Sequence, residues 1–364
     1  MKLALVGIAN SGRTTLFNSL TGQTASTTDY AAVEERPNVA VISVPDRRID
    51  ELARIFKPKK KTPTRVEYMD YLGFSRGDPG RNRKVIDFVK DSDALVYVLR
   101  GFENAHAAHP FGAVDPVRDF DTLEAELLLF DLDLAEKRLA GMEESARKGK
   151  PPNREEEAAV LKCRQALEAE TPLRYLALDA AQRRAIRHLS FMSSLPMMAV
   201  INVAEPDLAS AKGEAWRDAI RNRIARFTSE PAKAILLSGK IEMEISQLPP
   251  DEAADFLKDL GVSVSARERM IRESYDMLGL ISFLTVGEDE VRAWTVRKGV
   301  SARLAAGAIH SDIERGFIRA EVVSYDDFMM TGSLSAARAK GLLRLEGKQY
   351  VVRDGDIIDF RFNV

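Results

Sequence analysis

The sequence has very little of the residues from which disulfide frameworks and histidine-based sites are built. It contains one cysteine, Cys163, and four histidines in 364 residues. A single cysteine excludes an intrachain disulfide, and such usage is typical of a reducing compartment. His106 and His109 are close in sequence, but no cysteine or further histidine lies near them, so we do not expect a metal site there.

The sequence also lacks an excess of one charge and any long apolar run. The formal net charge is −2, from 53 Lys and Arg against 55 Asp and Glu, so binding to nucleic acid would need a local basic patch. No segment approaches the roughly 18 apolar residues of a membrane span. The apolar start MKLALVGIA continues into a motif, which favours a first strand over a signal peptide. We therefore expect a cytoplasmic protein.

What the sequence does have is a series of short apolar runs separated by helical patterns. The runs are rich in Val, Ile and Leu without alternation, as expected of strands covered on both faces. They are Leu3–Val6, Val39–Val44, Val66–Asp70, Ala94–Leu99, Met197–Val203 and Ala234–Leu237. Helical patterns such as Arg48–Phe56 and Arg83–Lys90 lie between them. This order predicts a doubly wound α/β sheet.

Between Asp119 and Arg187 the pattern is helical. Two amphipathic runs, the second from Arg154 to Leu167, flank a breaker, GKPPN at Gly149–Asn153. The pattern predicts a helical hairpin inserted into the α/β domain, with Cys163 in its core. Either a structural projection or a partner-binding arm would give this pattern.

After about residue 280 alternating runs predict a small mixed-sheet domain. The runs are Val291–Val296, Phe317–Val323, Gln349–Val352 and Ile357–Phe362. The expected domains are therefore a nucleotide-binding domain of residues 1–118 and 188–279, a hairpin of residues 119–187, and a C-terminal domain of residues 280–364.

The segment Gly7–Thr14 (GIANSGRT) has the spacing of a phosphate-binding loop, G-x-x-x-x-G-K-[ST], with Arg13 in the place of lysine. It follows an apolar strand and opens a helix, which is the context that the motif requires. The glycines let backbone N–H groups surround phosphate oxygens, and the helix N-terminus adds its dipole. Thr14 is expected to ligate Mg²⁺. A strand–helix turn without a ligand is the alternative.

Arg13 is the main local departure from this motif. Lysine is a compact charge that reaches the β- and γ-phosphates, whereas arginine is a planar fork on a differently shaped stem. We therefore expect altered nucleotide binding or slow turnover.

The segment Asp70–Gly73 also fits a GTPase-like site. Asp70-Tyr71-Leu72-Gly73 fits D-x-x-G, which would place Asp70 near Mg²⁺ through water and the Gly73 N–H at the γ-phosphate. Phe74 follows where Ras-like proteins have a water-orienting glutamine. Water must then be positioned by another group.

The base-reading side is also altered. Asn202-Val203-Ala204-Glu205 lies where N-K-x-D would read guanine, without the lysine and with Glu205 in place of Asp. Ser238-Gly239-Lys240 follows the next strand, where a base-flanking loop belongs.

Together these residues resemble the YchF family, the Obg-related P-loop NTPases with a C-terminal TGS domain. The resemblance extends over the whole chain, through NSGRTTLFNSLTG, PNVAVISVPDRRIDELARIFKPKK, Phe102-Glu103-Asn104, EVRAWTVRKG, HSDIERGFIRAEVVSYDDF and LEGKQYVVRDGDIIDFRFNV. It implies a Ras-like P-loop domain with an inserted α-helical hairpin and a C-terminal β-grasp TGS domain.

The resemblance also implies ligands and partners. It implies binding of ATP or GTP with Mg²⁺, and association with ribosomes or RNA. The implied nucleotide-binding residues are Asn10, Ser11, Gly12, Arg13, Thr14, Thr15, Gly73, Phe102, Asn202, Val203, Glu205 and Ser238. Phe102 would pack on the base or be a core aromatic, and His310 is expected to serve the fold or an interface.

Three departures from the family lie in the phosphate-sensing parts. Arg13 replaces lysine, Glu34 aligns with the threonine that completes Mg²⁺ coordination, and the segment after Gly73 is shorter than the family's. Glu34 joins Thr14 and Asp70 as a predicted Mg²⁺ ligand, although its charge would also repel a triphosphate. Together the three predict weak or altered hydrolysis.

The leading hypothesis is thus a nucleotide-binding regulatory protein that associates with ribosomes or RNA. One rival is a degenerate scaffold that binds partners through its helical and TGS domains, and another is a competent NTPase in which Arg13 substitutes for lysine. The basic run Lys57–Lys61 is either a solvated turn or a contact to RNA phosphates.

Overall fold

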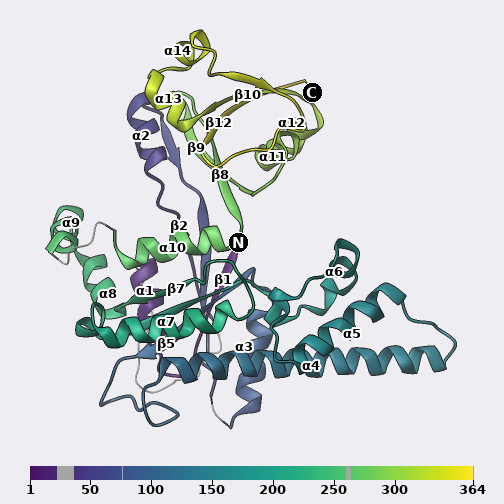
Figure 1. The fold of residues 1–364 in the computed structure, drawn as a ribbon. Coiled ribbons are helices and arrows are strands. Elements are labelled where there is room, and N and C mark those ends of the chain that lie inside the picture. Colours follow the sequence, from purple (N-terminus) through teal and green to yellow (C-terminus); the bar gives the residue numbers. More distant parts are fainter. Residues whose placement is uncertain (23–36, 76, 260–263, 364) are drawn as a thin grey trace. The chain divides into compact units, whose positions relative to one another are not determined.

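A computed structural model describes residues 1–22, 37–75, 77–259 and 264–363 of the chain (Figure 1). These residues form two compact units. Unit 1 combines residues 1–41 and 67–270, and unit 2 combines residues 42–66 and 271–364. Within the described residues, no helix has the length and apolar character that crossing a membrane requires.

The first sheet contains all six strands that the apolar runs predicted, in the order β2-β4-β1-β5-β6-β7. Neighbours from β4 through β7 pair in parallel. The strands are β1 (Lys2–Val6), β2 (Asn38–Ser43), β4 (Arg65–Asp70), β5 (Ala94–Gly101), β6 (Met197–Val203) and β7 (Ala234–Leu237). The doubly wound sheet predicted from sequence is therefore confirmed.

Helices cover this sheet because its central strands are apolar on both sides. Every residue of β5 and β6 is buried. On one face, Ala4, Val6 and Tyr97 share a core with α3 (Pro79–Val89), α4 (Pro116–Arg147) and α7 (Ala211–Ala225). Leu3 and Leu5 alternate with them and so point to the opposite face. The unit also contains α1 (Arg13–Thr21), which packs against α8 (Gly239–Gln247), as well as α9 (Pro250–Asp259) and the first turn of α10 (Ala266–Met277), whose remainder belongs to unit 2.

The inserted hairpin consists of α4 and α5 (Arg154–Glu168), as the two amphipathic runs predicted. The Asp115 side chain caps α4 by accepting from the N–H groups of Val117 and Arg118, and Asn153 caps α5. The breaker between residues 149 and 153 separates the helices. Cys163 is buried in the hairpin core, as expected, and burial raises the pKa of its thiol to about 11. The return to the sheet runs through η1 (Leu173–Tyr175), α6 (Ala180–Ile186), η2 (Arg187–Leu189) and η3 (Met192–Ser194).

Unit 2 is built on the mixed sheet that the C-terminal sequence predicted. Its order is β11-β10-β12-β8-β9-β3, in which β12–β8 and β9–β3 are parallel and the other pairs antiparallel. The strands are β3 (Lys60–Thr62), β8 (Leu280–Thr285), β9 (Glu290–Arg297), β10 (Phe317–Ser324), β11 (Arg344–Glu346) and β12 (Asp356–Phe362). The helices are α2 (Arg47–Phe56), α11 (Ala302–Ile309), α12 (Ser311–Arg315), α13 (Tyr325–Thr331) and α14 (Leu334–Ala339).

One predicted strand, Gln349–Val352, is wrong. Val351 forms only an isolated bridge with Ser301, and the strand that pairs with β10 lies earlier, at β11. The reason is local hydrogen bonding. The Tyr350 carbonyl accepts from Ala302 N–H, and Val352 N–H donates to the Val300 carbonyl, so this backbone is bonded to the start of α11.

The segment of residues 42–66, which the sequence analysis placed in the nucleotide-binding domain, packs in unit 2. Ile49 and Leu52 of α2 are buried in one cluster with Leu284, Val323 and Phe328. The hairpin, in turn, groups with unit 1. The division into three domains remains a prediction.

Candidate functional site

The loop from Gly7 to Gly12 joins β1 to α1 and has the backbone of a tight turn. Asn10 and Gly12 have positive φ values of 65° and 83°. A Cβ at Gly7 would lie 2.5 Å from the Val98 carbonyl oxygen, and a Cβ at Gly12 would lie 2.2 Å from Asn202 Nδ2. Glycine is therefore required at both positions by space, and at Gly12 also by conformation.

The N-terminus of α1 is left open by this loop. Gly12 is the N-cap residue and supplies no side-chain cap, and the first turn holds Arg13, Thr14 and Thr15 without an acidic residue. The first helical bond runs from Leu16 N–H to the Gly12 carbonyl. The backbone N–H groups of the first turn thus have no intrahelical partner, and such a terminus attracts anions.

Arg100, on β5, supports the loop through hydrogen bonds from inside the protein. Its role was not predicted from the sequence. Its side chain is 1% exposed. The guanidinium donates to three carbonyl oxygens, those of Phe102 (3.0 Å), Asn10 (3.3 Å) and Ala107 (2.8 Å). Burial lowers the pKa of Arg100, and the carboxylates of Glu103 and Asp119 oppose that shift. A lone arginine at the end of an apolar strand was the one available sequence signal.

Arg13 lies against the D-x-x-G segment. Its Nη1 donates to the Tyr71 carbonyl over 2.7 Å and lies 3.3 Å from Asp70 Oδ1. Thr14 Oγ1 donates to Asp70 Oδ2 over 2.7 Å. Arg13 and Asp70 are both buried. The two consecutive residues at the start of α1 therefore both bind the carboxylate that the sequence assigned to Mg²⁺.

Phe74, the residue after Gly73, is joined to the loop by two backbone hydrogen bonds. Phe74 N–H donates to the Gly7 carbonyl over 2.9 Å, and Ala9 N–H donates to the Phe74 carbonyl over 3.0 Å. The Phe74 side chain is buried in the core of unit 1. The residue that stands at the glutamine position is therefore a core residue and presents no polar group to water.

Asn202 connects the loop to the segment after β7. Its Nδ2 donates to the Ser11 carbonyl (3.2 Å) and its Oδ1 accepts from Gly239 N–H (2.9 Å). Ser238 is buried as the N-cap of α8. The structure thus brings together the loop, the Asn202 motif and the Ser238 segment, which are far apart in sequence.

The other predicted base contacts lie close by, with different side-chain roles. The Phe102 ring lies next to Gly12, 3.4 Å from where a Cβ of that residue would be, and Arg100 stacks on the ring. Val203 is buried in the core of unit 1, so its side chain is not free to meet a ligand. Glu205 is exposed at the start of η4 (Glu205–Asp207).

The oxygen atoms near Asp70 fit a hard cation. Asp70 Oδ1 is buried and accepts no hydrogen bond among the described residues, and Thr14 Oγ1 lies beside the same carboxylate. Mg²⁺ is usually held by one or two such side chains together with phosphates. Glu34, the third predicted ligand, lies outside the described residues. Over the described ranges, no three His, Cys, Asp or Glu side chains form a cluster for a metal held by protein alone.

His109 and His310 have structural partners. His109 Nδ1 accepts from Phe111 N–H, which places the proton on Nε2, bonded to buried Asp119 over 2.8 Å. His310 caps α12 by accepting from Asp312 N–H.

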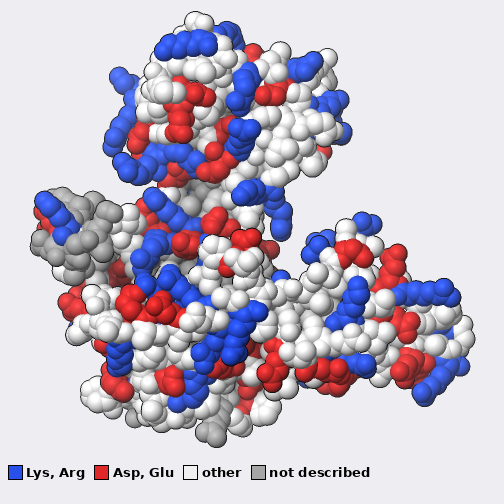
Figure 2. Space-filling view, in the orientation of Figure 1, with Lys and Arg blue, Asp and Glu red and all other residues white. Residues whose placement is uncertain are grey.

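Three lysines of the basic run Lys57–Lys61 form ion pairs with carboxylates within unit 2. Lys59, Lys60 and Lys61 pair with Asp289 (2.8 Å), Glu290 (3.6 Å) and Asp50 (2.6 Å). This pairing favours the solvated turn over an RNA contact. Figure 2 also shows Lys and Arg mixed with Asp and Glu along the hairpin, where pairs such as Lys137–Asp133 and Lys148–Glu144 lie one turn apart.

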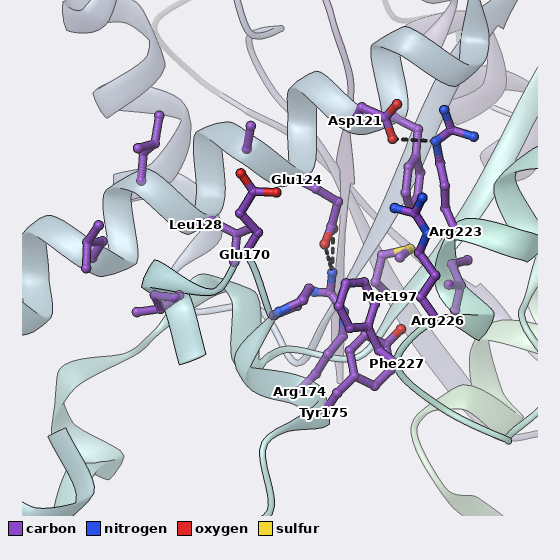
Figure 3. A pocket seen from close by; sticks show the side chains of 17 residues that line it. Asp121, Glu124, Leu128, Glu170, Arg174, Tyr175, Met197, Arg223, Arg226 and Phe227 are labelled. Atoms are coloured by element: carbon purple, nitrogen blue, oxygen red, sulfur yellow. Dashed lines mark hydrogen bonds and ion pairs between the residues drawn. The ribbon is translucent and has the colours of Figure 1, made fainter. Parts of the chain in front are cut away.

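A cavity of about 450 Å³ lies away from the loop, between α4, the segment after α5, and α7 (Figure 3). Its wall combines Leu128 and Met197 with the stacked rings of Tyr175 and Phe227. Glu124 binds Arg174, and Asp121 binds Arg223 over 2.6 Å in the wall of the cavity. These pairs satisfy most of its charged groups, and none of the residues predicted from the motifs lines it.

Comparisons with family models match two regions of the chain. A model described as "50S ribosome-binding GTPase" (MMR_HSR1) matches residues 2–144. The model YchF-GTPase_C, described as "Protein of unknown function (DUF933)", matches residues 280–363.

Several similar proteins align with this chain over nearly its whole length. The "Ribosome-binding ATPase YchF" of Bacillus subtilis (strain 168) is 39% identical over 363 residues, covering 99% of this chain and 98% of that protein. The protein of the same name from Escherichia coli O157:H7 is 35% identical, covering 100% and 99%. The solved structure "Structure of the Schizosaccharomyces pombe YchF GTPase" matches with a TM-score of 0.82 and 29% identity, covering 99% of this chain and 97% of that one.

Proposed function

This chain belongs to the YchF family, and from that premise we propose that it binds a purine nucleotide, ATP or GTP, as a regulatory protein associated with the ribosome. The observation that carries the proposal is the open N-terminus of α1, with a glycine-containing loop in front of it and Asn202 locking the loop to the Ser238 segment. Phosphates are the anions that such a terminus binds.

The proposed nucleotide-binding residues are those that the resemblance implied. The loop residues Asn10 to Thr15 and the Gly73 N–H would meet the phosphates. Phe102, Asn202, Glu205, Ser238 and the backbone of Val203 would surround the base. Thr14 and Asp70 would hold Mg²⁺, which supplies charge neutralisation between phosphate oxygens when bound.

We propose weak hydrolysis, for two reasons. One position that usually carries a water-orienting side chain holds Phe74, and the charge that usually meets the phosphates is bound elsewhere. The Phe74 side chain is in the core, so water has no polar partner at that position. The charge of Arg13 is directed to Tyr71 and Asp70. Slow chemistry with intact binding would suit a protein that signals its nucleotide state to a partner.

Calorimetric titration with ATP, GTP and their diphosphates, with and without Mg²⁺, tests the binding. We expect heat with triphosphates and diphosphates. No heat with any nucleotide would overturn the proposal in favour of the rival, a scaffold that binds partners through its helical and C-terminal parts.

A phosphate-release assay on wild type and Arg13→Lys tests the turnover. Lysine would point to the β- and γ-phosphates and leave Asp70 to the metal, so we expect faster release, by roughly 10-fold, from about 1.4 kcal/mol of added transition-state stabilisation. Equal rates would show that Arg13 is not what limits turnover and would favour the third hypothesis, in which Arg13 substitutes for lysine.

The ribosome is the proposed partner because the relatives that match the whole chain bear the name ribosome-binding ATPase. Cosedimentation with 70S ribosomes, with and without ATP, tests this. Recovery of the protein in the ribosome-free supernatant under all nucleotide conditions would contradict it.

A further inference from the structure

Two arginines meet at Gly73, the glycine of the D-x-x-G segment. Arg13 Nη2 lies 3.0 Å from where a Cβ of Gly73 would be. Arg81 Nε donates to the Gly73 carbonyl over 3.0 Å. Only one carboxylate, that of Asp70, forms an ion pair with either of them within the described parts of the chain. The surroundings of Gly73 therefore carry more positive than negative charge.

The two guanidinium groups differ in whether a carboxylate neutralises their charge. Arg13 donates to the Tyr71 carbonyl and faces Asp70. Arg81 uses Nε alone, and its two terminal nitrogens have no hydrogen-bond or ion-pair partner among residues that the structure describes. Its nearest carboxylate in sequence, Asp78, accepts from the Arg81 backbone N–H over 2.9 Å and forms no ion pair with the side chain. Arg81 thus keeps four N–H donors and a full charge available.

The charges of the two arginines act on each other. Burial lowers the pKa of the Arg13 guanidinium, Asp70 raises it, and the charge of Arg81 lowers it again. Two cations that repel each other, of which only Arg13 is paired with a carboxylate, form an arrangement that an added anion stabilises.

Arg81 is held on a fixed turn. It lies in the first turn of α3, which begins at Pro79 after the N-cap Asp78. Asn82, the next residue, accepts from Ser75 N–H over 2.9 Å and donates to Glu126 over 3.2 Å. The bond from Ser75 to Asn82 holds the first turn of α3 close to Ser75, and Arg81 of that turn reaches the Gly73 carbonyl.

We propose that Arg81 binds the terminal phosphate of the nucleoside triphosphate, in place of the lysine that the loop lacks. The inference rests on the proposed nucleotide-binding function. Arg13 stays with Asp70 and Tyr71, while Arg81, anchored through Nε at the residue whose N–H is expected to meet the γ-phosphate, presents its terminal nitrogens to that group. Guanidinium–phosphate bonds are charge-assisted and frequently bidentate, so arginine suits this part.

Binding titrations of ATP and ADP in the presence of Mg²⁺ test the inference. We expect Arg81→Gln to weaken ATP binding by roughly 10- to 100-fold, the range of a charge-assisted hydrogen bond, and ADP binding by less than about 3-fold. Arg83→Gln is the matched control, since it removes the same charge from an exposed position on the same helix. Equal losses in Arg81→Gln and Arg83→Gln would overturn the inference.

Chemical modification of the wild-type protein gives a second readout that does not depend on a variant folding. Phenylglyoxal modifies accessible arginines, and the modified positions are read by mass spectrometry. We expect ATP to protect Arg81 several-fold more than ADP does, with Arg83 unaffected by either. Equal protection of Arg81 by ATP and ADP would contradict the inference.

A double variant connects Arg81 to the missing lysine. In an Arg13→Lys background the lysine can reach the terminal phosphates, so Arg81→Gln should cost ATP binding less than it does in wild type. An equal cost in both backgrounds would mean that Arg81 does not replace lysine. If wild type binds no nucleotide at all, the proposed function itself fails, whereas ATP binding that ignores Arg81 sinks only this inference.

Discussion

At the scale of single residues, the loop is held in part by side chains that no nucleotide would touch. Arg100 is the clearest example, because it satisfies three carbonyl oxygens from inside the protein. One of them belongs to Asn10, a loop residue with a positive φ. The position of the loop therefore depends on a residue on β5.

Replacing Arg100 by Met should destabilise the protein and weaken nucleotide binding together. The apolar side chain leaves three carbonyl groups unpaired, each at a cost of about 1 kcal/mol or more, so we expect a loss of roughly 3 to 5 kcal/mol. Urea unfolding and an ATP titration measure the two effects. Arg147→Met, at the exposed end of α4, should change neither, and normal binding by Arg100→Met would contradict the role given to Arg100.

Gly12→Ala should disrupt the site through one methyl group. Its Cβ would lie 2.2 Å from Asn202 Nδ2, so either the loop or Asn202 must move, and nucleotide affinity should fall by at least about 10-fold. Gly22→Ala is the control, because Gly22 also has a positive φ of 68° but no atom within 4 Å of its Cβ position. Both variants share a backbone cost of about 1 kcal/mol, and only the first should lose binding in a calorimetric titration.

Sequence analysis could place the loop, Asp70 and Asn202, because each belongs to a motif with a fixed spacing after a strand. It could not assign Arg100 or Arg81. Their roles depend on carbonyl groups of Asn10, Ala107 and Gly73 that the fold brings to them. The place of Arg100 at the end of an apolar strand is a local signal, but it does not identify the carbonyl groups that the side chain binds.

At the scale of elements, Asp131 joins the hairpin to the sheet domain within unit 1. It is fully buried on α4 and accepts from Met192 N–H, Ser193 N–H and Ser193 Oγ at 2.6–2.8 Å. Burial raises the pKa of its carboxyl to about 6, against these hydrogen bonds, which lower it.

This raised pKa predicts a pH dependence. The folded protein binds the Asp131 proton more tightly than the unfolded chain does, so protonation of Asp131 stabilises the fold. This stabilisation is fully present below about pH 4 and is lost as the pH rises through about 6. A shift of about two units corresponds to roughly 3 kcal/mol at most. The difference in unfolding free energy between wild type and Asp131→Asn should therefore fall between pH 4 and pH 7. A difference that stays constant across this range would show that Asp131 does not titrate there.

Most helices and strands could be predicted from the sequence where the spacing of apolar residues and the residues at the element ends indicate the same structure. The six strands of the first sheet and the breaker at residues 149–153 are examples. The strand predicted at Gln349–Val352 is wrong, because alternating apolar residues do not determine which segment a backbone will hydrogen-bond to. Here the hydrogen bonds go to the start of α11 and the residues before it. Helix α3 begins at Pro79, four residues before the predicted start, at an Asp-Pro cap that signals a helix N-terminus.

At the scale of the whole molecule, the chain passes between the two units more than once. Residues 42–66 lie in unit 2 although both flanking segments lie in unit 1. The sequence predicted that segment in the N-terminal domain because its helical pattern lies between two of the apolar runs, in the order of a doubly wound sheet. The apolar face of α2 does not reveal which sheet it will cover.

Leu52→Ala, far from the C-terminus in sequence, should therefore loosen the C-terminal sheet. Leu52 is fully buried in a cluster with Leu284, Val323 and Phe328, and truncation of such a residue costs about 2 to 5 kcal/mol. Hydrogen exchange should become faster in β8, β10 and β12 and remain slow in β5 and β6. Faster exchange confined to β5 and β6 would place α2 with the other unit.

The buried face of α2 has a consequence for synthesis on the ribosome. Ile49 and Leu52 leave the exit tunnel about 230 residues before Leu284, the first strand residue that covers them. At about 5 to 20 residues per second, the helix waits on the order of 10 to 50 seconds with its apolar side uncovered. The second unit therefore cannot close around α2 until the strands and hairpin of the first have been made, and α2 is a segment that a nascent-chain chaperone would have to shield.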